Sequence, residues 1–189
     1  GWRLASSCGV LFSFVIVLLS LAAASAQNPN PPNRVLELDG TNSFVELPPN
    51  IFNDLTEATV EAWVRWDDFS GSWKRVFNYG EARRDMSLLT VSGLPKLSFV
   101  VAGSAGTAAD LHWIVVEAPL SPRQWYHVAG VSGPDGMKLY LNGTLVGTNA
   151  FTGSFSGFRN GTRNYLGERV STNSPPEQLH RWERTSKIM

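Results

Sequence analysis

Between residues 34 and 170 the sequence alternates short apolar runs with tight turns, and this pattern restricts the fold more than any other feature. Val, Leu, Phe, Trp and Tyr alternate with polar residues, and Gly, Asn, Asp and Pro separate the runs. A period of two is typical of β-strands, and no stretch shows the 3.6-residue period of an amphipathic helix. The chain is therefore predicted to be all-β.

The pattern predicts about eleven short strands. They lie at residues 34–39, 43–47, 57–66, 74–79, 86–92, 96–101, 112–117, 124–132, 137–142, 144–149 and 163–168. Asn142-Gly143 between two such runs is the strongest hairpin signal, because both residues tolerate positive φ. Asp39-Gly40 and the stretch 133–136 predict further turns, and a short helical or irregular turn is expected near 50–55. Short strands with tight returns predict a two-sheet antiparallel β-sandwich or jelly roll.

The two ends of the chain differ from this central part. Residues 1–26 have one charge, Arg3, and an apolar run of about 15 residues followed by small residues, which is the pattern of a secretory signal peptide. An uncleaved membrane anchor is the alternative, although spanning a bilayer takes about 20 apolar residues. Residues 27–33 form a proline-rich spacer, and residues 171–189 predict an irregular tail. We expect a secreted, periplasmic or extracellular protein that meets a membrane only through its N-terminal segment, and only if that segment is uncleaved.

Composition excludes several classes of partner and cofactor. The 16 basic and 16 acidic residues balance, and no basic patch stands out, so nucleic acid is not expected as a partner. The single cysteine, Cys8, lies in the predicted signal peptide, which leaves the rest without a disulfide or a cysteine-based metal site. Three histidines do not favour a multi-histidine zinc site.

Four blocks of sequence resemble a known family. They are "RVLELDGTNSFVELPP", "TVEAWV", "WYHVAGV" with "LYLNG" after it, and "NYLGE". In this order they resemble the laminin-G-like jelly roll of the concanavalin A-like lectin and glucanase superfamily, which also includes pentraxins. The resemblance covers residues 34–170 and implies a two-sheet sandwich. It implies little about activity, because one fold hosts many functions.

Alternation divides the strand at 57–66 between two faces. The core face is expected to carry Val60, Ala62, Val64 and Trp66, and the opposite face Thr59, Glu61, Trp63 and Arg65. In the resembled family the block around His127 is a framework strand. The resemblance therefore implies a packed structural histidine, with Trp125 as a core aromatic. Core filling is also the expectation for Trp63 and Trp66, although the face with Trp63 mixes charge with an aromatic, and partial solvation or a groove is the alternative there.

Members of the resembled family continue after the "NYLGE" strand into a closing strand that pairs near the N-terminal strand. Nothing in residues 171–189 matches it, which implies a truncated or frame-shifted C-terminus. An edge strand without its neighbour exposes backbone donors and acceptors. We therefore expect marginal stability or low solubility of the isolated chain.

Glycoside hydrolases of the superfamily carry paired carboxylates on one strand face. The nearest acidic groups, Glu37 with Asp39, Glu57 with Glu61, and Asp67-Asp68, do not form that motif. A hydrolase is accordingly the least favoured function, and no catalytic residue is predicted.

A binding surface is the favoured alternative, because aromatic faces stack on sugar rings while polar groups bind hydroxyls. The candidate residues are Trp73, Trp113, Tyr79, Arg83 and Arg84. An aromatic that closes the end of the sandwich is the alternative for the tryptophans. Calcium is a candidate cofactor, since Asp67, Asp68, Asp110 and Asp135 are loop acids, but no ligand spacing links them.

These observations predict an exported, non-catalytic binding or adhesion module that recognises a glycan or an extracellular protein. The alternative is a structural or sensory accessory domain of a larger protein, without a small ligand.

Overall fold

The computed structural model describes residues 34–39, 43–81, 83–117, 120–157 and 163–167, together with the backbone of 186–188. Apart from Arg34, these residues belong to one compact unit that spans 35–189. The predicted signal peptide and the proline-rich spacer lie outside the described residues. Among the residues that are described, no helix is long and apolar enough to cross a membrane.

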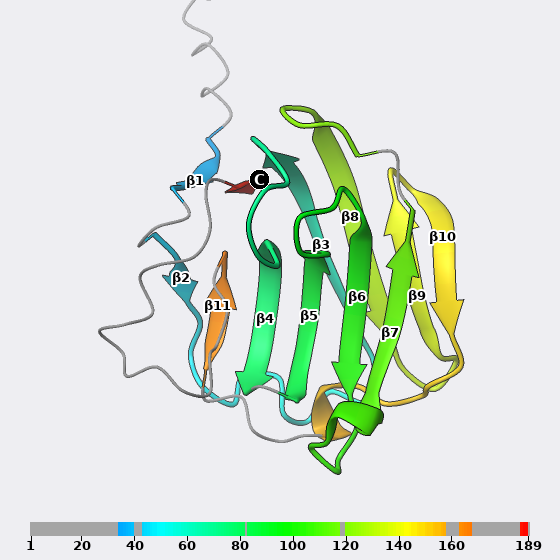
Figure 1. The fold of residues 1–189 in the computed structure, drawn as a ribbon. Coiled ribbons are helices and arrows are strands. Elements are labelled where there is room, and N and C mark those ends of the chain that lie inside the picture. Colours follow the sequence, from blue (N-terminus) through cyan, green and yellow to red (C-terminus); the bar gives the residue numbers. More distant parts are fainter. Residues whose placement is uncertain are drawn as a thin grey trace, which may run out of the picture. The chain divides into compact units, whose positions relative to one another are not determined.

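Two antiparallel sheets of six strands form a sandwich (Figure 1). Sheet A has the order β1 (Leu36–Leu38), β12 (Ser186–Ile188), β3 (Ala58–Trp66), β8 (Trp125–Ser132), β9 (Met137–Leu141) and β10 (Thr144–Asn149). Sheet B has the order β2 (Val45–Glu46), β11 (Asn164–Leu166), β4 (Arg75–Glu81), β5 (Arg84–Thr90), β6 (Leu97–Ala102) and β7 (Leu111–Val116). The predicted all-β fold and its two antiparallel layers are confirmed.

Each of the expected strands forms within a few residues of its predicted limits. Asn142 and Gly143 both have positive φ, 50° and 78°, as the predicted hairpin requires. The segment near 50–55 is a turn and not a helix. Two short 3-10 helices, Ala108–Asp110 and Phe155–Gly157, were not predicted, because three residues are too few to show a helical period.

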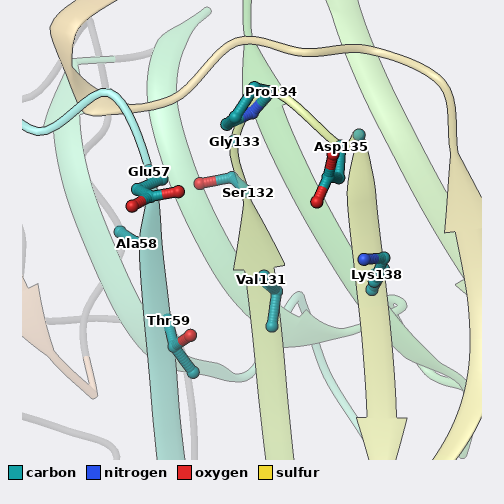
Figure 2. Close-up of a pocket in the computed structure, with 10 residues that line it drawn as sticks. Glu57, Ala58, Thr59, Val131, Ser132, Gly133, Pro134, Asp135 and Lys138 are labelled. Atoms are coloured by element: carbon teal, nitrogen blue, oxygen red, sulfur yellow. The ribbon is translucent and has the colours of Figure 1, made fainter.

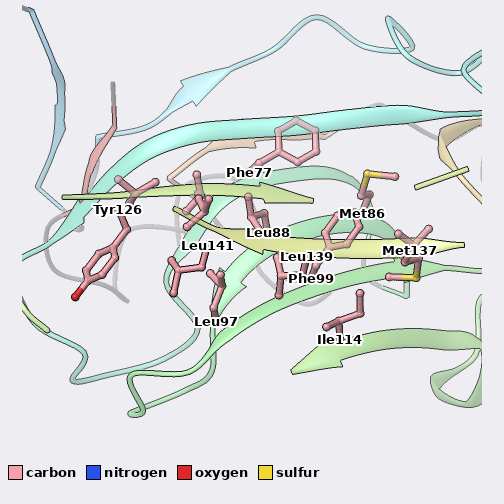
Figure 3. Close-up of a cluster of buried hydrophobic side chains, with 14 of the residues drawn as sticks. Phe77, Met86, Leu88, Leu97, Phe99, Ile114, Tyr126, Met137, Leu139 and Leu141 are labelled. Carbon is pink, nitrogen blue, oxygen red and sulfur yellow. The ribbon is translucent and has the colours of Figure 1, made fainter. Parts of the chain in front are cut away.

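The core lies between the sheets and consists of alternate side chains from both (Figure 3). Leu88, Leu97 and Phe99 of sheet B and Leu139 of sheet A are fully buried. The ring of Phe99 packs against Gly130 of β8 so closely that a Cβ there would lie 2.7 Å from ring atoms. A glycine on the inner face of β8 therefore makes room for an aromatic of the opposite sheet.

A short strand lies within the segment that was predicted to be an irregular C-terminal tail. Residues 186–188 form β12, which is antiparallel to β1 on one side and to β3 on the other, with Ile188 opposite both Leu36 and Val64. The place beside β3 that the sequence left empty is thus filled along three residues. A strand this short carries too little alternation to be recognised. Residues 171–185 lie outside the described residues.

The faces of β3 and β8 correct a second prediction. Val64 and Trp66 are fully buried, as expected, but Trp63 is 45% exposed and Trp125 is only half-buried. Trp63 and Trp125 lie on the outer face of sheet A, so their assignment to the core is wrong. On β8 both faces carry aromatic bulk, and alternation alone does not show that Tyr126 points inward.

Candidate functional site

One row of side chains crosses the outer face of sheet B. Antiparallel pairing places Asn78, Ser87, Val100 and Trp113 side by side on β4, β5, β6 and β7. They alternate with Phe77, Leu88, Phe99 and Ile114, which fill the core. Although Asn78, Ser87 and Val100 face away from the core, each is at most 2% exposed. These three residues are therefore shielded from solvent, and Trp113 is the exposed end of the row.

A polar network occupies the β4 and β5 end of this row. Arg75 Nε donates to Asn78 Oδ1 over 3.0 Å, and Ser87 Oγ lies 2.9 Å from the same oxygen. The Ser87 hydroxyl is also 2.8 Å from Asp85 Oδ2, and Asn78 Nδ2 donates to the Gly80 carbonyl over 3.2 Å. Because Asn78 and Ser87 are buried, they orient the half-buried guanidinium of Arg75. None of the four side chains in this network was predicted as a site residue, although Asn78 and Ser87 interrupt apolar strands.

Trp73 and Trp113, both predicted site residues, come together at the β7 end of the row. Their ring centroids are 5.8 Å apart, with 44° between the ring planes. Trp113 is 36% exposed and Trp73 is half-buried. Trp73 therefore reaches from the 67–74 loop across to β7. The pair presents aromatic surface on the same face as the Arg75 network.

A buried lysine holds the loop that carries Trp73. Lys74 is 1% exposed, and its Nζ lies 3.1 Å from Asp68 Oδ1. Asp68 also accepts hydrogen bonds from the backbone N–H and hydroxyl of Ser70, at 2.8 and 2.7 Å. Burial raises the pKa of Asp68, but the hydrogen bonds from Ser70 and Lys74, with the lysine charge, outweigh it and lower the pKa overall. A further hydrogen bond, from Ser92 Oγ to the Gly71 carbonyl, ties the loop to the β5–β6 turn.

Asp67, Asp68 and Asp110, three of the four acids that were considered as calcium ligands, have partners of their own. Asp67 Oδ1 lies 3.8 Å from Arg65, and Asp110 Oδ2 accepts a 2.6 Å hydrogen bond from the Ala105 N–H. In the part of the chain that the structure describes, no three His, Cys, Asp or Glu side chains are grouped to hold a metal ion. Calcium binding stays a prediction.

The other predicted site residues do not join this surface. Tyr79 is fully buried, and its hydroxyl donates to Asn53 Oδ1 over 2.7 Å. Its burial raises the pKa of the phenol, although a hydrogen bond from the Phe52 N–H lowers it. The prediction that Tyr79 is exposed is wrong, because alternation with Asn78 turns it toward the core. Arg83 and Arg84 are exposed at the β4–β5 turn, at the opposite end of β4 from Trp73.

His127 lies on the outer face of sheet A. Its Nε2 is 3.4 Å from Glu61 Oε2 on β3, its ring centroid is 5.4 Å from that of Trp63, and 27% of its side chain is exposed. His127 thus has a partner across the sheet in Glu61, but it lies on the solvent side of the sheet and not in the core. Trp63 and His127 thus form a second aromatic surface, on the opposite side of the sandwich from Trp73 and Trp113.

A polar hollow lies where β3 begins and β8 ends (Figure 2). It has a volume of about 260 Å³, and its charged lining residues are Glu57, Asp135 and Lys138. No aromatic ring lines it, so it offers no stacking surface for a sugar. The outer face of sheet B therefore remains the best candidate site.

Two six-stranded antiparallel sheets, with aromatic and polar side chains on an outer face, define a lectin-like jelly-roll sandwich. The chain belongs to the Concanavalin A-like lectin/glucanases superfamily, because residues 39–177 match the laminin-G-like profile of that superfamily. The resemblance inferred from the sequence is thereby confirmed. Curated protein sequences give no match to the chain.

Solved structures share this fold. The CBM40 module of the Ruminococcus gnavus IT-sialidase, solved with α2,3-sialyllactose, has a TM-score of 0.60 at 12% identity, covering 82% of this chain and 89% of that one. Domains LG4-5 of the mouse laminin α1 chain have a TM-score of 0.56 at 14% identity, covering 85% and 46%. A botulinum neurotoxin type C structure, described as depending on two ganglioside molecules for cell entry, has a TM-score of 0.55 at 14% identity, covering 82% and 40%. At these sequence identities, the similarity shows that the fold is shared and nothing more.

Proposed function

We propose that this chain is an exported, non-catalytic module that binds a glycan through the outer face of sheet B. The contact between Trp73 and Trp113 is the observation that supports this most directly. Indole faces can take the apolar C–H face of a sugar ring, and Arg75, held by Asn78, places a positive charge on the same face. The relatives by fold include a carbohydrate-binding module and a ganglioside-dependent toxin, which agrees with this function.

The proposal that the module is non-catalytic is supported by its acidic groups. Asp85, a carboxylate in the network of Arg75, Asn78 and Ser87, is only 8% exposed and accepts a hydrogen bond from the Ser87 hydroxyl. A buried, hydrogen-bonded acid is poorly placed to meet a sugar. Glycoside hydrolysis commonly uses two carboxylates that flank the scissile bond. New reducing ends after incubation of the chain with β-glucans would contradict a purely binding function.

Recognition of an extracellular protein is the second candidate, and the Trp63 surface on sheet A favours it. Trp63 is 45% exposed, which is more than Trp113, and it stands beside His127 and Glu61. Large exposed aromatics are enriched at the centres of protein interfaces. The two surfaces lie on different sheets, so single substitutions can separate them.

The test is a glycan array probed with the full chain, followed by titration of the best oligosaccharide against three variants. Trp113→Ala and Trp73→Ala should each weaken binding about fivefold, since one aromatic contact contributes about 1 kcal/mol. Trp63→Ala, a matched exposed tryptophan on the other sheet, should bind like the wild type. If no glycan binds, or if only Trp63→Ala loses binding, the site on sheet B is wrong.

A further inference from the structure

The hairpin turn between β9 and β10 carries a residue that its backbone geometry does not require. Asn142 and Gly143 supply the two positive φ angles of the turn, 50° and 78°. Thr144 follows them, so the three residues also form the Asn-x-Thr acceptor sequence for N-linked glycosylation. The side chain of Thr144 is exposed and has no hydrogen-bond partner among the described residues. The turn therefore explains Asn142 and Gly143 but leaves the hydroxyl of Thr144 unexplained.

The structure leaves room for a glycan at this turn, where all three residues are exposed. Asn142 Oδ1 accepts a 2.9 Å hydrogen bond from the His127 N–H, which orients the side-chain amide. Asn142 Nδ2, the atom that carries the sugar in an N-linked glycan, has no hydrogen-bond partner in the described part of the chain. A Cβ added at Gly143 would meet no atom within 4 Å, so the turn is open to solvent. A glycan on Nδ2 would therefore break no hydrogen bond that the fold uses.

We infer that Asn142 is glycosylated during export, an inference that rests on the proposed export of the chain. Asn142 Nδ2 loses a proton and forms a bond to C1 of the first sugar of a lipid-pyrophosphate-linked oligosaccharide. The bond between C1 and the pyrophosphate oxygen breaks, and the lipid pyrophosphate leaves. The donor and its oligosaccharyltransferase belong to the secretory pathway, which also modifies Asn in this sequence context in other exported proteins. Thr144 is the positioning residue, because the acceptor sequence requires a hydroxyl two residues after the Asn.

The glycan stands beside the outer face of sheet A. Asn142 lies opposite His127, because its N–H donates to the His127 carbonyl over 2.7 Å, and His127 lies opposite Trp63 on β3. The backbone of Trp63 is thus two strand spacings, or about 10 Å, from that of Asn142. A branched glycan of several sugars reaches across this distance and shields Trp63, while Trp73 and Trp113 on the other sheet stay open. Glycosylation therefore permits ligand binding on sheet B and hinders a protein partner at the Trp63 surface.

The experiment translates the full chain in the presence of microsomes that contain an oligosaccharyltransferase. Protease protection reports import, and mass spectrometry of glycopeptides distinguishes Asn142 from a second acceptor sequence at Asn160, which lies outside the described residues. The imported wild type should carry a glycan at Asn142, Thr144→Ala should lose it, and Thr144→Ser should keep it. Thr148→Ala is the matched control and should keep the glycan, because Thr148 is also exposed on β10 but belongs to no acceptor sequence.

Hydroxyl-radical footprinting of the chain secreted by a eukaryotic cell tests where the glycan lies. Oxidation of Trp63 should be lower in the glycosylated wild type than in Thr144→Ala, and oxidation of Trp113 should be the same in both. Equal oxidation of Trp63 would overturn the placement beside sheet A. An imported wild type without a glycan at Asn142, or a Thr144→Ala chain that keeps one there, would overturn the inference and leave the proposed export standing. A chain that is not imported would overturn both.

Discussion

Gly130 and Phe99 show how one absent side chain decides the packing between the sheets. Gly130 lies on the inner face of β8, and an added Cβ would approach ring atoms of Phe99 to 2.7 Å. Phe99 is itself fully buried, so its ring cannot move into solvent. We expect Gly130→Ala to lower the free energy of unfolding by roughly 1–3 kcal/mol, the usual cost of overpacking a core.

Urea denaturation followed by tryptophan fluorescence measures this change. Gly157→Ala is the matched control, because no atom lies within 4 Å of the Cβ it would add. That control should leave the free energy of unfolding nearly unchanged or raise it slightly. Equal stability of Gly130→Ala and the wild type would show that the sheets are less tightly packed at this point than the structure indicates.

At the scale of elements, β12 joins β1 to the rest of sheet A. β1 pairs with β12, and β12 pairs with β3, so the three residues of β12 carry the hydrogen bonds on both sides. A stop codon after residue 185 should therefore free β1 and uncover the inward side chains of Leu38, Val64 and Trp66, which are at most 2% exposed. We expect a lower melting temperature and a red-shifted tryptophan emission. Removal of Met189 alone should have neither effect, and an unchanged melt after the longer truncation would contradict the pairing.

The strands could be predicted from the sequence, but the direction in which their faces point could only be predicted in part. Alternation and the Asn142-Gly143 turn report local backbone geometry, which each segment expresses by itself. Which face is buried depends on the opposite sheet. β3 carries Val60, Ala62, Val64 and Trp66 on one face and charges with Trp63 on the other, so its core face was predicted correctly although Trp63 itself was assigned to the core. β8 carries aromatics on both, so Trp125 was misplaced.

The candidate site was predictable to a smaller extent, because it depends on contacts between distant segments. Trp73 and Trp113 were predicted from their places near loops, and the structure brings them together. The Arg75, Asn78 and Ser87 network was not predicted, since pairing across β4 and β5 assembles it. Tyr79 was chosen as an aromatic beside a loop, yet its strand alternation with Asn78 already indicated burial.

At the scale of the whole molecule, the sandwich is one unit without a disulfide, and the exposed part of the proposed site is the Trp73 and Trp113 pair at one end of the row. The exposed fraction of Trp113 is 36%, and Trp73 is only half-buried, so a bound sugar would remain largely in contact with water. Two stacking contacts contribute about 1 kcal/mol each to the binding free energy. Together with a few hydrogen bonds they correspond to a dissociation constant of about 1 mM. A single copy is therefore expected to bind weakly.

Several copies of such a site on one surface should bind a polymeric glycan much more tightly than one copy does. When the chain is immobilised at increasing density, one polymeric glycan can engage several copies, and its dissociation should slow by at least about 100-fold between sparse and dense surfaces. The affinity for a short oligosaccharide should not change with density. Surface plasmon resonance measures both, with Trp113→Ala and Trp63→Ala surfaces as controls. Only the Trp113→Ala surface should lose retention of the polymer. Tight retention that does not depend on density would mean that one copy binds through a more enclosed site than the outer face of sheet B.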